Sequence, residues 1–377
     1  MLIDDLFTPA ILLDVDILER NLSRMQKKVS TLGAALRPHI KTHKCLEIAE
    51  RQREFGAKGI TVSTFYEAEQ FARAGFADIT WAFPLPPVYA PVVAKLAQEI
   101  TLRVVIDSKD ALESLEKACR EVQATVHTWL KVDCGYHRAG VDPSSPLAEE
   151  LVRALSKSNV LHFDGILSHS GHAYNASSRE EILGVANQER AVMTDFADRM
   201  RRNGYAIPGV SIGSTPAMAV IENLEGVSEV RPGNYCFFDH TMMDLGVCGL
   251  EDCAVTVLAS VISHQPGASH FVVDAGALAL SKDVGATRKP GIPSLGTLFE
   301  DYDGKRLHED IVLRTLSQEH GKVVADNPSA LEGKFRVGSK VRIVENHSCL
   351  TVAHFDVYHV VRGKEVIDRW KILRGRI

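Results

Sequence analysis

Several features are missing from this sequence, and each absence excludes a class of protein. The longest nearly apolar run among its 377 residues, from Cys253 to Ile262, is about half the length of a membrane span. The 43 basic and 48 acidic side chains leave a net charge of −5, so no positive field is available to attract nucleic acid or an anionic membrane. We therefore expect neither partner.

Cysteine is scarce and forms no recognisable framework. The seven cysteines are odd in number, scattered, and include no C-x-x-C pair, which is typical of reduced cytosolic thiols. The first ten residues carry two acidic groups and no apolar stretch follows them, so we expect no secretory signal. These observations favour a cytoplasmic location.

The first 240 residues alternate between short β-branched runs and amphipathic stretches. Eight strands are predicted, at Leu36–Lys41, Ile60–Thr64, Asp78–Phe83, Leu102–Asp107, Val126–Asp133, Leu161–Ser168, Gly209–Ile212 and Ser228–Gly233. Helices are predicted between them, at Leu46–Phe55, Tyr66–Ala74, Lys109–Arg120, Leu147–Ser156 and Glu180–Arg202. This is the pattern of a TIM-type (β/α)8 barrel. An open doubly wound sheet is the rival, but no Gly-rich dinucleotide turn follows the first strand.

The remaining sequence predicts a second, β-rich domain. A strand at Ala10–Asp14 precedes a helix at Ile17–Leu32, and the barrel has no need of this strand. Further strands are predicted at Val255–Ser263, His270–Asp274, Phe335–Glu345, Leu350–Val361 and Glu365–Ile372, with loops over Lys282–Asp303. We therefore divide the chain into a barrel over residues 16–245 and a β-rich domain over residues 1–15 plus 246–377, which the N-terminal strand joins.

The carboxyl ends of barrel strands carry the chemistry of barrel enzymes, and the last two strands usually hold phosphate. Here those two strands end in the segments GSTP and PGNY. Closely spaced backbone N–H groups at Gly213–Thr215 and Gly233–Asn234, with Pro216 at the first position of a helix, would favour an anion. Each segment alone is an ordinary turn, but the two together predict a phosphate site.

Lys41 lies at the predicted end of the first barrel strand, among other cationic residues. Desolvation and these neighbours would favour its neutral, nucleophilic amine. Lys44 is the alternative, although residues three apart on a strand face opposite sides. A nucleophilic lysine together with a phosphate site implies pyridoxal phosphate.

His347 and Cys349 are two residues apart on a predicted strand, so both would face one side. Imidazole and thiolate are typical zinc ligands. The pattern by itself is weak, because a core histidine beside a buried thiol would look the same.

The sequence resembles the fold-type III pyridoxal phosphate enzymes of the D-serine dehydratase and D-threonine aldolase family, whose N-terminal domain is similar to that of alanine racemases. Nearly the whole chain carries the resemblance, through TPAILLDVDILERN, RPHIKTHK, VSTFYEAE, KVDCGYHRAG, GILSHSGHAY, SIGSTP, EVRPGNY, VVDAG and ENHSC. It implies a barrel followed by a β domain, and a homodimer in which the β domain of one chain closes the other's barrel mouth.

The resemblance also assigns roles to single residues. Lys41 would form the Schiff base and remove the substrate's α-proton, His169 would stack on the pyridine ring, and Arg138 would lie near the phenolic oxygen. Further cofactor contacts would come from Tyr174, Ser214, Thr215, Arg231, Gly233 and Asn234, with Arg231 facing the pyridine nitrogen. His347 and Cys349 would hold Zn²⁺, whereas the aldolases typically carry His-x-Asp with Mn²⁺ or another hard divalent metal.

The thiolate ligand favours the dehydratase branch of this resemblance. The expected reaction converts D-serine to pyruvate and ammonia, or acts on a 3-hydroxyaspartate-type substrate. D-Threonine aldolase-like cleavage to glycine and an aldehyde is the alternative. An amino-acid racemase would have no role for the metal pair, and a non-catalytic pyridoxal phosphate-binding protein would lack the second domain. A second base is left open among Glu345, His172 and His354.

Overall fold

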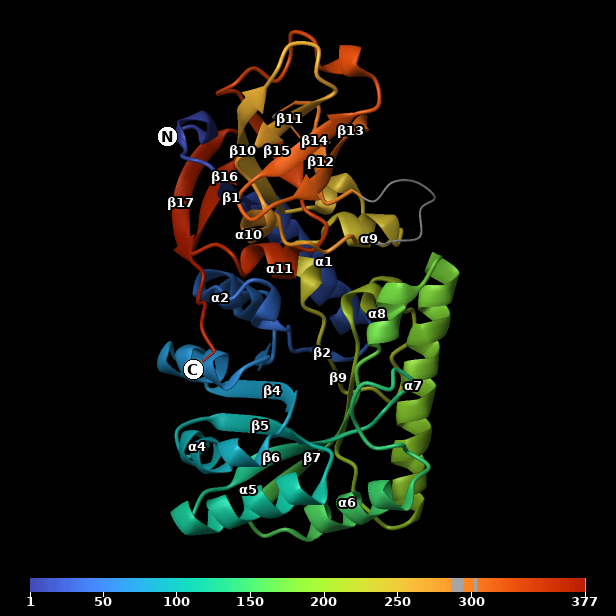
Figure 1. Ribbon diagram of the computed structural model, residues 1–377. Coiled ribbons are helices and arrows are strands. Elements are labelled where there is room, and N and C mark those ends of the chain that lie inside the picture. Colours follow the sequence, from blue (N-terminus) through green and yellow to red (C-terminus); the bar gives the residue numbers. More distant parts are fainter. Residues whose placement is uncertain (286–293, 302–303, 377) are drawn as a thin grey trace. The chain divides into compact units, whose positions relative to one another are not determined.

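The computed structural model describes residues 1–285, 294–301 and 304–376. Contacts divide the chain into two compact units, which Figure 1 shows coloured along the sequence. The barrel unit consists of Arg24–Lys41, Ile48–Gly233 and the C-terminal residues from Gly375. The β unit consists of Met1–Ser23, Thr42–Glu47 and Asn234–Arg374. Helix α1 (Val15–Thr31) contributes to both units.

Eight parallel strands form the barrel unit, as predicted. They are β2 (Ala35–Leu36), β3 (Ile60–Val62), β4 (Asp78–Pro84), β5 (Thr101–Ile106), β6 (Val126–Lys131), β7 (Leu161–Leu167), β8 (Gly209–Ile212) and β9 (Glu229–Val230), paired in the order β2-β9-β8-β7-β6-β5-β4-β3. A parallel bridge between His39 and Thr61 joins the two end strands, and the Thr61 N–H donates to the Pro38 carbonyl at 2.8 Å. The sheet therefore closes on itself, and the predicted barrel is confirmed.

Seven helices connect these strands in the described part of the barrel unit. They are α2 (Leu46–Glu54), α3 (Phe65–Arg73), α4 (Ala90–Leu96), α5 (Lys109–Val122), α6 (Pro146–Lys157), α7 (Arg179–Arg202) and α8 (Thr215–Val220). Thr64 caps α3 and Ser108 caps α5, each side chain accepting a first-turn N–H. The sequence did not predict α4, because this short apolar segment lacks the polar face of an amphipathic helix. Helix α8 is the one expected to follow the GSTP segment.

Strand register arranges the barrel interior in layers. Arg103 of β5 is paired with His127 of β6, and two residues further along the same strands Val105 is paired with Trp129. Because residues two apart share a face, both pairs face the same side of the sheet. Val105, Trp129 and Leu167 form a buried apolar cluster. A charged layer at the amino ends of these strands therefore adjoins an apolar layer.

The β unit is built on nine strands within the described residues. They are β1 (Ala10–Asp14), β10 (Val255–His264), β11 (His270–Val273), β12 (Thr297–Phe299), β13 (Leu307–Leu316), β14 (Gly321–Ala325), β15 (Lys340–Val344), β16 (Val357–Arg362) and β17 (Glu365–Lys371). Their order is β11-β14-β13-β12-β15-β10-β1-β16-β17, and a β10–β11 pairing closes six of them into a barrel. Strand β1 pairs with β10 and β16, so the N-terminal strand joins this sheet as predicted.

Several predictions for the β unit were wrong. Residues 286–293 and 302–303 of the predicted loop over Lys282–Asp303 lie outside the described residues, but Thr297–Phe299 forms β12. Strands β13 and β14 were not predicted, because charges interrupt the apolar pattern of LHEDIVLRTL. The predicted strand Leu350–Val361 starts only at Val357, since Ser348–Val352 forms helix α11.

Three short α-helices lie in the described part of the β unit, namely α9 (His240–Asp244), α10 (Ala277–Leu280) and α11. None of the helices in the described segments of the chain combines the length and apolar character needed to cross a bilayer.

Candidate active site

Lys41 lies in a 3₁₀ turn, Ile40–Thr42, that follows β2. The first barrel strand was predicted to extend to Lys41, but it ends at Leu36, and Pro38 has no N–H to continue a ladder. Lys44 belongs to the β unit and has a left-handed backbone with φ 49°. Neither lysine lies on a strand, so the argument that residues three apart on a strand face opposite sides was wrong for this pair. The two lysines differ in backbone conformation instead.

Four cationic groups act together on His169, which follows β7. Burial lowers the pKa of His169 well below its ordinary value, and the charges of Lys131, Lys41, Arg138 and Arg231 lower it further. The imidazole is therefore neutral. The structure thus brings the predicted residues Lys41, Arg138, His169 and Arg231 into one electrostatic group at the carboxyl ends of the strands.

Tyr136 supports two members of this group. The Arg138 guanidinium lies over the Tyr136 ring, 5.0 Å from its centroid, and the His169 ring meets it edge-on at 6.2 Å. His172 stacks on the same ring at 5.8 Å. A Cβ at Gly171 would lie 2.3 Å from the ring, so the close approach requires glycine. These aromatic contacts fix the directions of Arg138 and His169.

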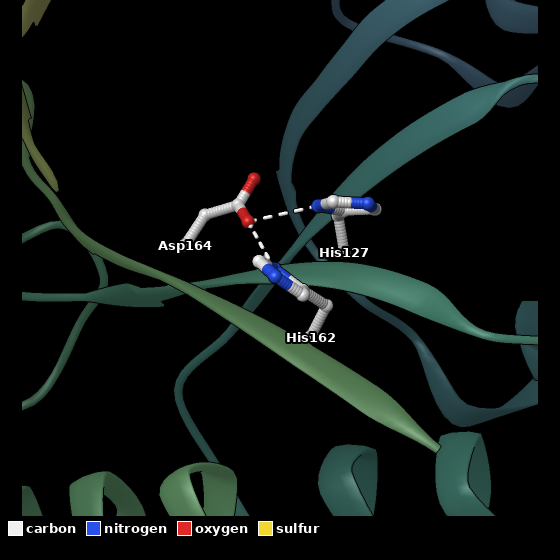
Figure 2. A group of neighbouring side chains, drawn as sticks. All are labelled: His127, His162 and Asp164. Carbon is white, nitrogen blue, oxygen red and sulfur yellow. Dashed lines mark hydrogen bonds and ion pairs between the residues drawn. The ribbon is translucent and has the colours of Figure 1, made fainter. Parts of the chain in front are cut away.

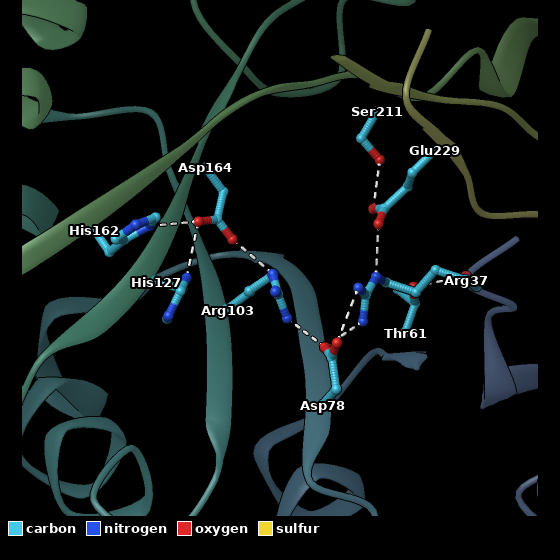
Figure 3. Close-up of polar contacts among 9 residues, drawn as sticks. All are labelled: Arg37, Thr61, Asp78, Arg103, His127, His162, Asp164, Ser211 and Glu229. Atoms are coloured by element: carbon cyan, nitrogen blue, oxygen red, sulfur yellow. Dashed lines mark hydrogen bonds and ion pairs between the residues drawn. The ribbon is translucent and has the colours of Figure 1, made fainter. Parts of the chain in front are cut away.

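Arg231 is 5% exposed and held by hydrogen bonds. Its guanidinium donates to the Ser211 hydroxyl and to the Ser168 carbonyl. Ser211 donates to Glu229 at 2.8 Å, and Glu229 also accepts from Arg37 at 2.7 Å, as Figure 3 shows. Burial lowers the pKa of Arg231 below its ordinary value, although Glu229 acts in the opposite direction. A guanidinium stays protonated in proteins even so, and its hydrogen bonds hold this cation in a fixed position.

Lys131, at the end of β6, is a member of the group that sequence reasoning missed. Burial lowers its pKa to about 7, and the charge of Arg231 adds to this shift, so its amine is partly neutral near neutral pH. A lysine at the end of an apolar strand was the signal that singled out Lys41. The same signal is present in the segment TWLKVD.

Glu189 of α7 is a second missed residue. Its fully buried carboxylate accepts hydrogen bonds from Ser168 at 2.7 Å and from Ser170 at 2.6 Å. Ser170 in turn lies 3.4 Å, oxygen to oxygen, from the Ser214 hydroxyl. No local signal could have revealed Glu189, because its partners are 19 and 21 residues away in the sequence.

Two of the predicted phosphate-binding residues, Ser214 and Thr215, lie at the start of α8. Gly213 has a left-handed φ of 106°, Ser214 is the N-cap, and Ser214 and Thr215 are 2% and 1% exposed. The Ser214 side chain makes no capping hydrogen bond, so it does not satisfy the N–H groups of the first turn. Pro216 is the second helical residue, not the first as predicted, because Thr215 starts the helix. A bound anion is suited to such a turn.

The other predicted cofactor-binding residues are divided between the two units. Gly233 is buried in the barrel unit, and Tyr174 lies partly buried in the 3₁₀ helix Gly171–Asn175. Asn234 belongs to the β unit, where its side-chain amide donates to Asp239 at 2.6 Å and to Ser348 at 2.9 Å. Only the backbone of Asn234 therefore fits the role of a phosphate ligand.

His347 and Cys349 come together in the β unit at the start of a helix. His347 is the N-cap of α11 and Cys349 is its second residue, so their predicted placement on a strand was wrong. The His347 Nδ1 lies 2.8 Å from Asp283 Oδ2. Burial lowers the pKa of His347, but hydrogen bonds with Asp283 and Cys349 outweigh it and raise the pKa to about 11. The Cys349 Sγ is 3.2 Å from the Thr42 hydroxyl.

Glu345 adds an oxygen donor to this part of the β unit. It is fully buried, and neither carboxyl oxygen has a hydrogen-bond partner among the described residues. Burial, helped by Asp239, raises its pKa well above the ordinary value. Leaving a buried acid without partners is costly, and a nearby cation would remove that cost. The thiol, imidazole and carboxyl donors fit a divalent metal such as zinc.

Known proteins with similar sequences share this organisation. Residues 13–241 match the family described as alanine racemase, N-terminal domain, and residues 254–361 match the putative serine dehydratase domain. The D-threo-3-hydroxyaspartate dehydratase of Delftia sp. (strain HT23) is 37% identical, over 98% of this chain and 97% of that one. The D-serine dehydratase of Dictyostelium discoideum is 36% identical over the same shares. A D-threonine aldolase of Arthrobacter sp is 29% identical, over 97% and 92%.

Solved structures agree with these similarities. The Delftia dehydratase has a TM-score of 0.93 at 36% identity, covering 99% of both chains. A cysteine-to-alanine mutant of D-threo-3-hydroxyaspartate dehydratase in the metal-free form has a TM-score of 0.94 at 36% identity and covers 100% of both chains. An alanine racemase of Clostridium difficile 630 has a TM-score of 0.72 at 14% identity, covering 98% and 100%, which shows the fold alone. The alanine racemase-like fold is confirmed.

Proposed function

The chain belongs to the family that joins an alanine racemase N-terminal domain to a serine dehydratase domain, and from this we propose a pyridoxal phosphate- and metal-dependent lyase of D-3-hydroxy amino acids. Its main reaction would be the dehydration of D-serine, or of a 3-hydroxyaspartate-type substrate, to a keto acid and ammonia. The observation that carries this proposal is the presence, in one chain, of a cation-lined barrel site and a thiol–imidazole pair.

The residues of the barrel fit pyridoxal phosphate. The bound cofactor would supply an electron sink for the substrate's Cα. Lys41 would hold the cofactor until the substrate's amino group takes its place, and the released Lys41 amine would then accept the α-proton from one face. The neutral His169 ring would stack on the pyridine, Arg138 would hold the phenolic oxygen, and Arg231 would face the ring nitrogen. A fixed cation such as Arg231 would keep that nitrogen unprotonated.

Small residues would hold the phosphate. Ser214, Thr215, Gly233 and the backbone of Asn234 would bind it, with Tyr174 beside the cofactor. We assign this role to a domain over residues 16–245. The buried hydroxyls and the start of α8 support the assignment.

We propose zinc as the metal, held by His347 and Cys349 in a domain of residues 1–15 plus 246–377. A thiolate ligand favours Zn²⁺ over Mn²⁺ or another hard cation, and bound zinc would act as a Lewis acid at the substrate's β-hydroxyl. Asp283 would orient His347 so that Nε2 is its ligand atom. Similar solved structures include the metal-free cysteine-to-alanine mutant and a histidine-to-alanine mutant two positions before it, in D-threo-3-hydroxyaspartate dehydratase, which supports this pair.

Aldol cleavage is the second candidate. A base would take the β-hydroxyl proton, and the Cα–Cβ bond would break to give glycine and an aldehyde. The similarity to D-threonine aldolases, 29% identical to the Arthrobacter sp enzyme, favours keeping this candidate.

A product analysis separates the candidates. The purified protein with pyridoxal phosphate and Zn²⁺ would receive D-serine or D-threonine, with the Lys41→Ala variant as the blank. Keto acid and ammonia would establish the dehydratase, and glycine with an aldehyde would establish the aldolase. Absence of both products, with the cofactor still bound to lysine by its absorbance, would overturn the substrate assignment.

We also propose a homodimer that resides in the cytoplasm. All seven cysteines are free thiols, as a reducing compartment would keep them. Light scattering of the purified holoenzyme would test the dimer, and a mass corresponding to one chain would contradict it.

A further inference from the structure

Three side chains of metal-ligand type gather at the amino ends of β6 and β7 (Figure 2). His169, by contrast, follows the carboxyl end of β7. His127 is the second residue of β6, His162 is the second residue of β7, and Asp164 follows on β7. The Nδ1 atoms of His127 and His162 lie 2.8 Å and 2.7 Å from the same oxygen, Oδ1 of Asp164. The centroids of the two imidazole rings are 4.4 Å apart.

Strand register and a β-bulge build this arrangement. His127 and His162 are directly paired on neighbouring parallel strands, which places their rings side by side. Thr128 pairs with Phe163 and Trp129 with Gly165, so Asp164 is an extra residue in β7. A bulge re-aims the side chain it carries. Gly165 permits it, because its φ is 128° and a Cβ there would lie 2.0 Å from the Gly209 carbonyl oxygen.

Charged neighbours fix the position of the Asp164 carboxylate. Arg103 donates to the second oxygen of Asp164 at 2.6 Å, and an ion-pair chain continues through Asp78 and Arg37 to Glu229 (Figure 3). Burial acts to raise the pKa of Asp164, but histidine hydrogen bonds and Arg103 outweigh it and lower that pKa. Arg103 therefore holds the Asp164 carboxylate in place beside the two imidazole rings.

We propose that His127, His162 and Asp164 form a second metal site, which binds a divalent transition metal ion such as Zn²⁺. All three ligand atoms lie within 4.8 Å of one another, a spacing that one ion with bonds of about 2.1 Å spans after small adjustments. The His127, His162 and Asp164 side chains are 28%, 59% and 11% exposed, so an ion can enter and water can complete its coordination.

The chemistry of this site differs from that of the His347–Cys349 pair. Its donors are nitrogen and oxygen, without a thiolate, and Arg103 orients the carboxylate as an outer partner. An ion here would cross-link two adjacent barrel strands at their amino ends. In barrels this end serves stability and the opposite end serves catalysis, so we expect occupancy to raise the melting temperature and leave the reaction type unchanged.

Zinc titration of a variant without the other pair tests the site. The His347→Ala/Cys349→Ala double variant, loaded with pyridoxal phosphate and stripped with a chelator, would be titrated with Zn²⁺ in a calorimeter. We expect one ion per chain, with Zn²⁺ raising the melting temperature. Adding His162→Ala should weaken binding by more than about 10-fold, as expected for losing a direct ligand. His137→Ala is the matched control, because its exposed imidazole pairs with one carboxylate, Asp133, at 2.8 Å.

Cobalt gives a second readout. Co²⁺ bound by the double variant should lack the thiolate charge-transfer band, and Asp164→Asn should abolish its remaining spectrum while circular dichroism shows an intact fold. Absence of zinc binding by the double variant would overturn the proposal. Binding that survives both His162→Ala and Asp164→Asn, or that is lost equally in His137→Ala, would also overturn it.

Discussion

Two histidines of this chain occupy opposite electrostatic surroundings. In the barrel unit, burial and four cationic residues hold the pKa of His169 well below its ordinary value. In the β unit, burial is outweighed by Asp283 and Cys349, and the pKa of His347 rises to about 11. The same side chain is therefore a neutral ring in one unit and a cation in the other.

The difference shows what each region is suited to bind. Surplus positive charge around a neutral ring attracts an anion, as a phosphate-bearing cofactor requires. Carboxylate and thiol groups around an imidazole attract a cation, as a metal site requires. A lyase that uses both groups needs fields of opposite sign, and this chain builds them from different parts of its sequence.

Removing Lys41 should abolish cofactor attachment in the barrel unit, and this is the largest effect that we expect. Lys41→Ala should lower turnover by ~10³-fold or more, because covalent attachment and the α-proton base are lost together. The absorbance of the lysine-bound cofactor should disappear, while zinc content stays unchanged. Absorbance and product assays on the dialysed variant measure this.

Lys44→Ala is the matched control for that experiment. Lys44 has a left-handed backbone and belongs to the β unit, so its variant should keep the cofactor absorbance. Loss of the absorbance in Lys44→Ala, with retention in Lys41→Ala, would move the cofactor to Lys44.

Removing the Cys349 thiolate should abolish metal binding by the His347–Cys349 pair in the β unit. Cys349→Ala should lose the zinc ion of the His347–Cys349 pair and lower D-serine turnover by ~10²-fold or more, since a Lewis acid supplies several kcal/mol. The cofactor absorbance should remain. Elemental analysis and kinetics would be compared with Cys119→Ala, which removes a buried thiol whose pKa burial raises to about 11. Equal zinc content in Cys349→Ala and the wild type would exclude Cys349 as a ligand.

The sequence predicted the barrel better than it predicted the β unit, for a physical reason. Parallel strands buried on both faces are continuous apolar runs, and Gly209–Ile212 was predicted with its observed bounds. Strand β13 faces solvent on one side and carries charges, so its pattern was missed. Helix α11 has the β-branched composition of a strand, but Leu350 and Thr351 donate to the His347 carbonyl and form a turn.

The candidate site was predictable where one segment carries the signal. The spacing of His347 and Cys349 indicated a pair, although the reason given, a shared strand face, was wrong. Asp283 could not be found in this way, because it is 64 residues from His347 and the contact depends on the tertiary fold. Lys131 could have been found by the reasoning applied to Lys41, since its burial follows from its place at the end of β6.

Replacing Asp283 should sharpen the comparison with a smaller effect. Asp283→Asn keeps the shape but removes the charge that orients His347, so zinc affinity should fall by about 10- to 100-fold. Zinc titration measures the change, and kcat should recover at saturating zinc, as expected for a positioning residue. Asp244→Asn is the control, because Asp244 pairs with His240 at 3.2 Å in the same unit. An unchanged affinity in Asp283→Asn would contradict the role.

The smallest expected effect is the release of a proton from His347 when zinc binds, and it tests directly whether His347 and His169 differ in charge. Without metal, the raised pKa of His347 contributes stability that is complete below its ordinary value of 6.5 and is lost as pH rises through about 11. Zinc must displace that proton, so between these pH values its affinity should rise about tenfold per pH unit for this one group. Calorimetry at several pH values, in buffers of different protonation enthalpy, counts the protons released.

Binding of the cofactor should release no proton from His169, because that imidazole is already neutral. If zinc released no proton from the wild type, His347 would be neutral before binding, and the two histidines would not differ in charge.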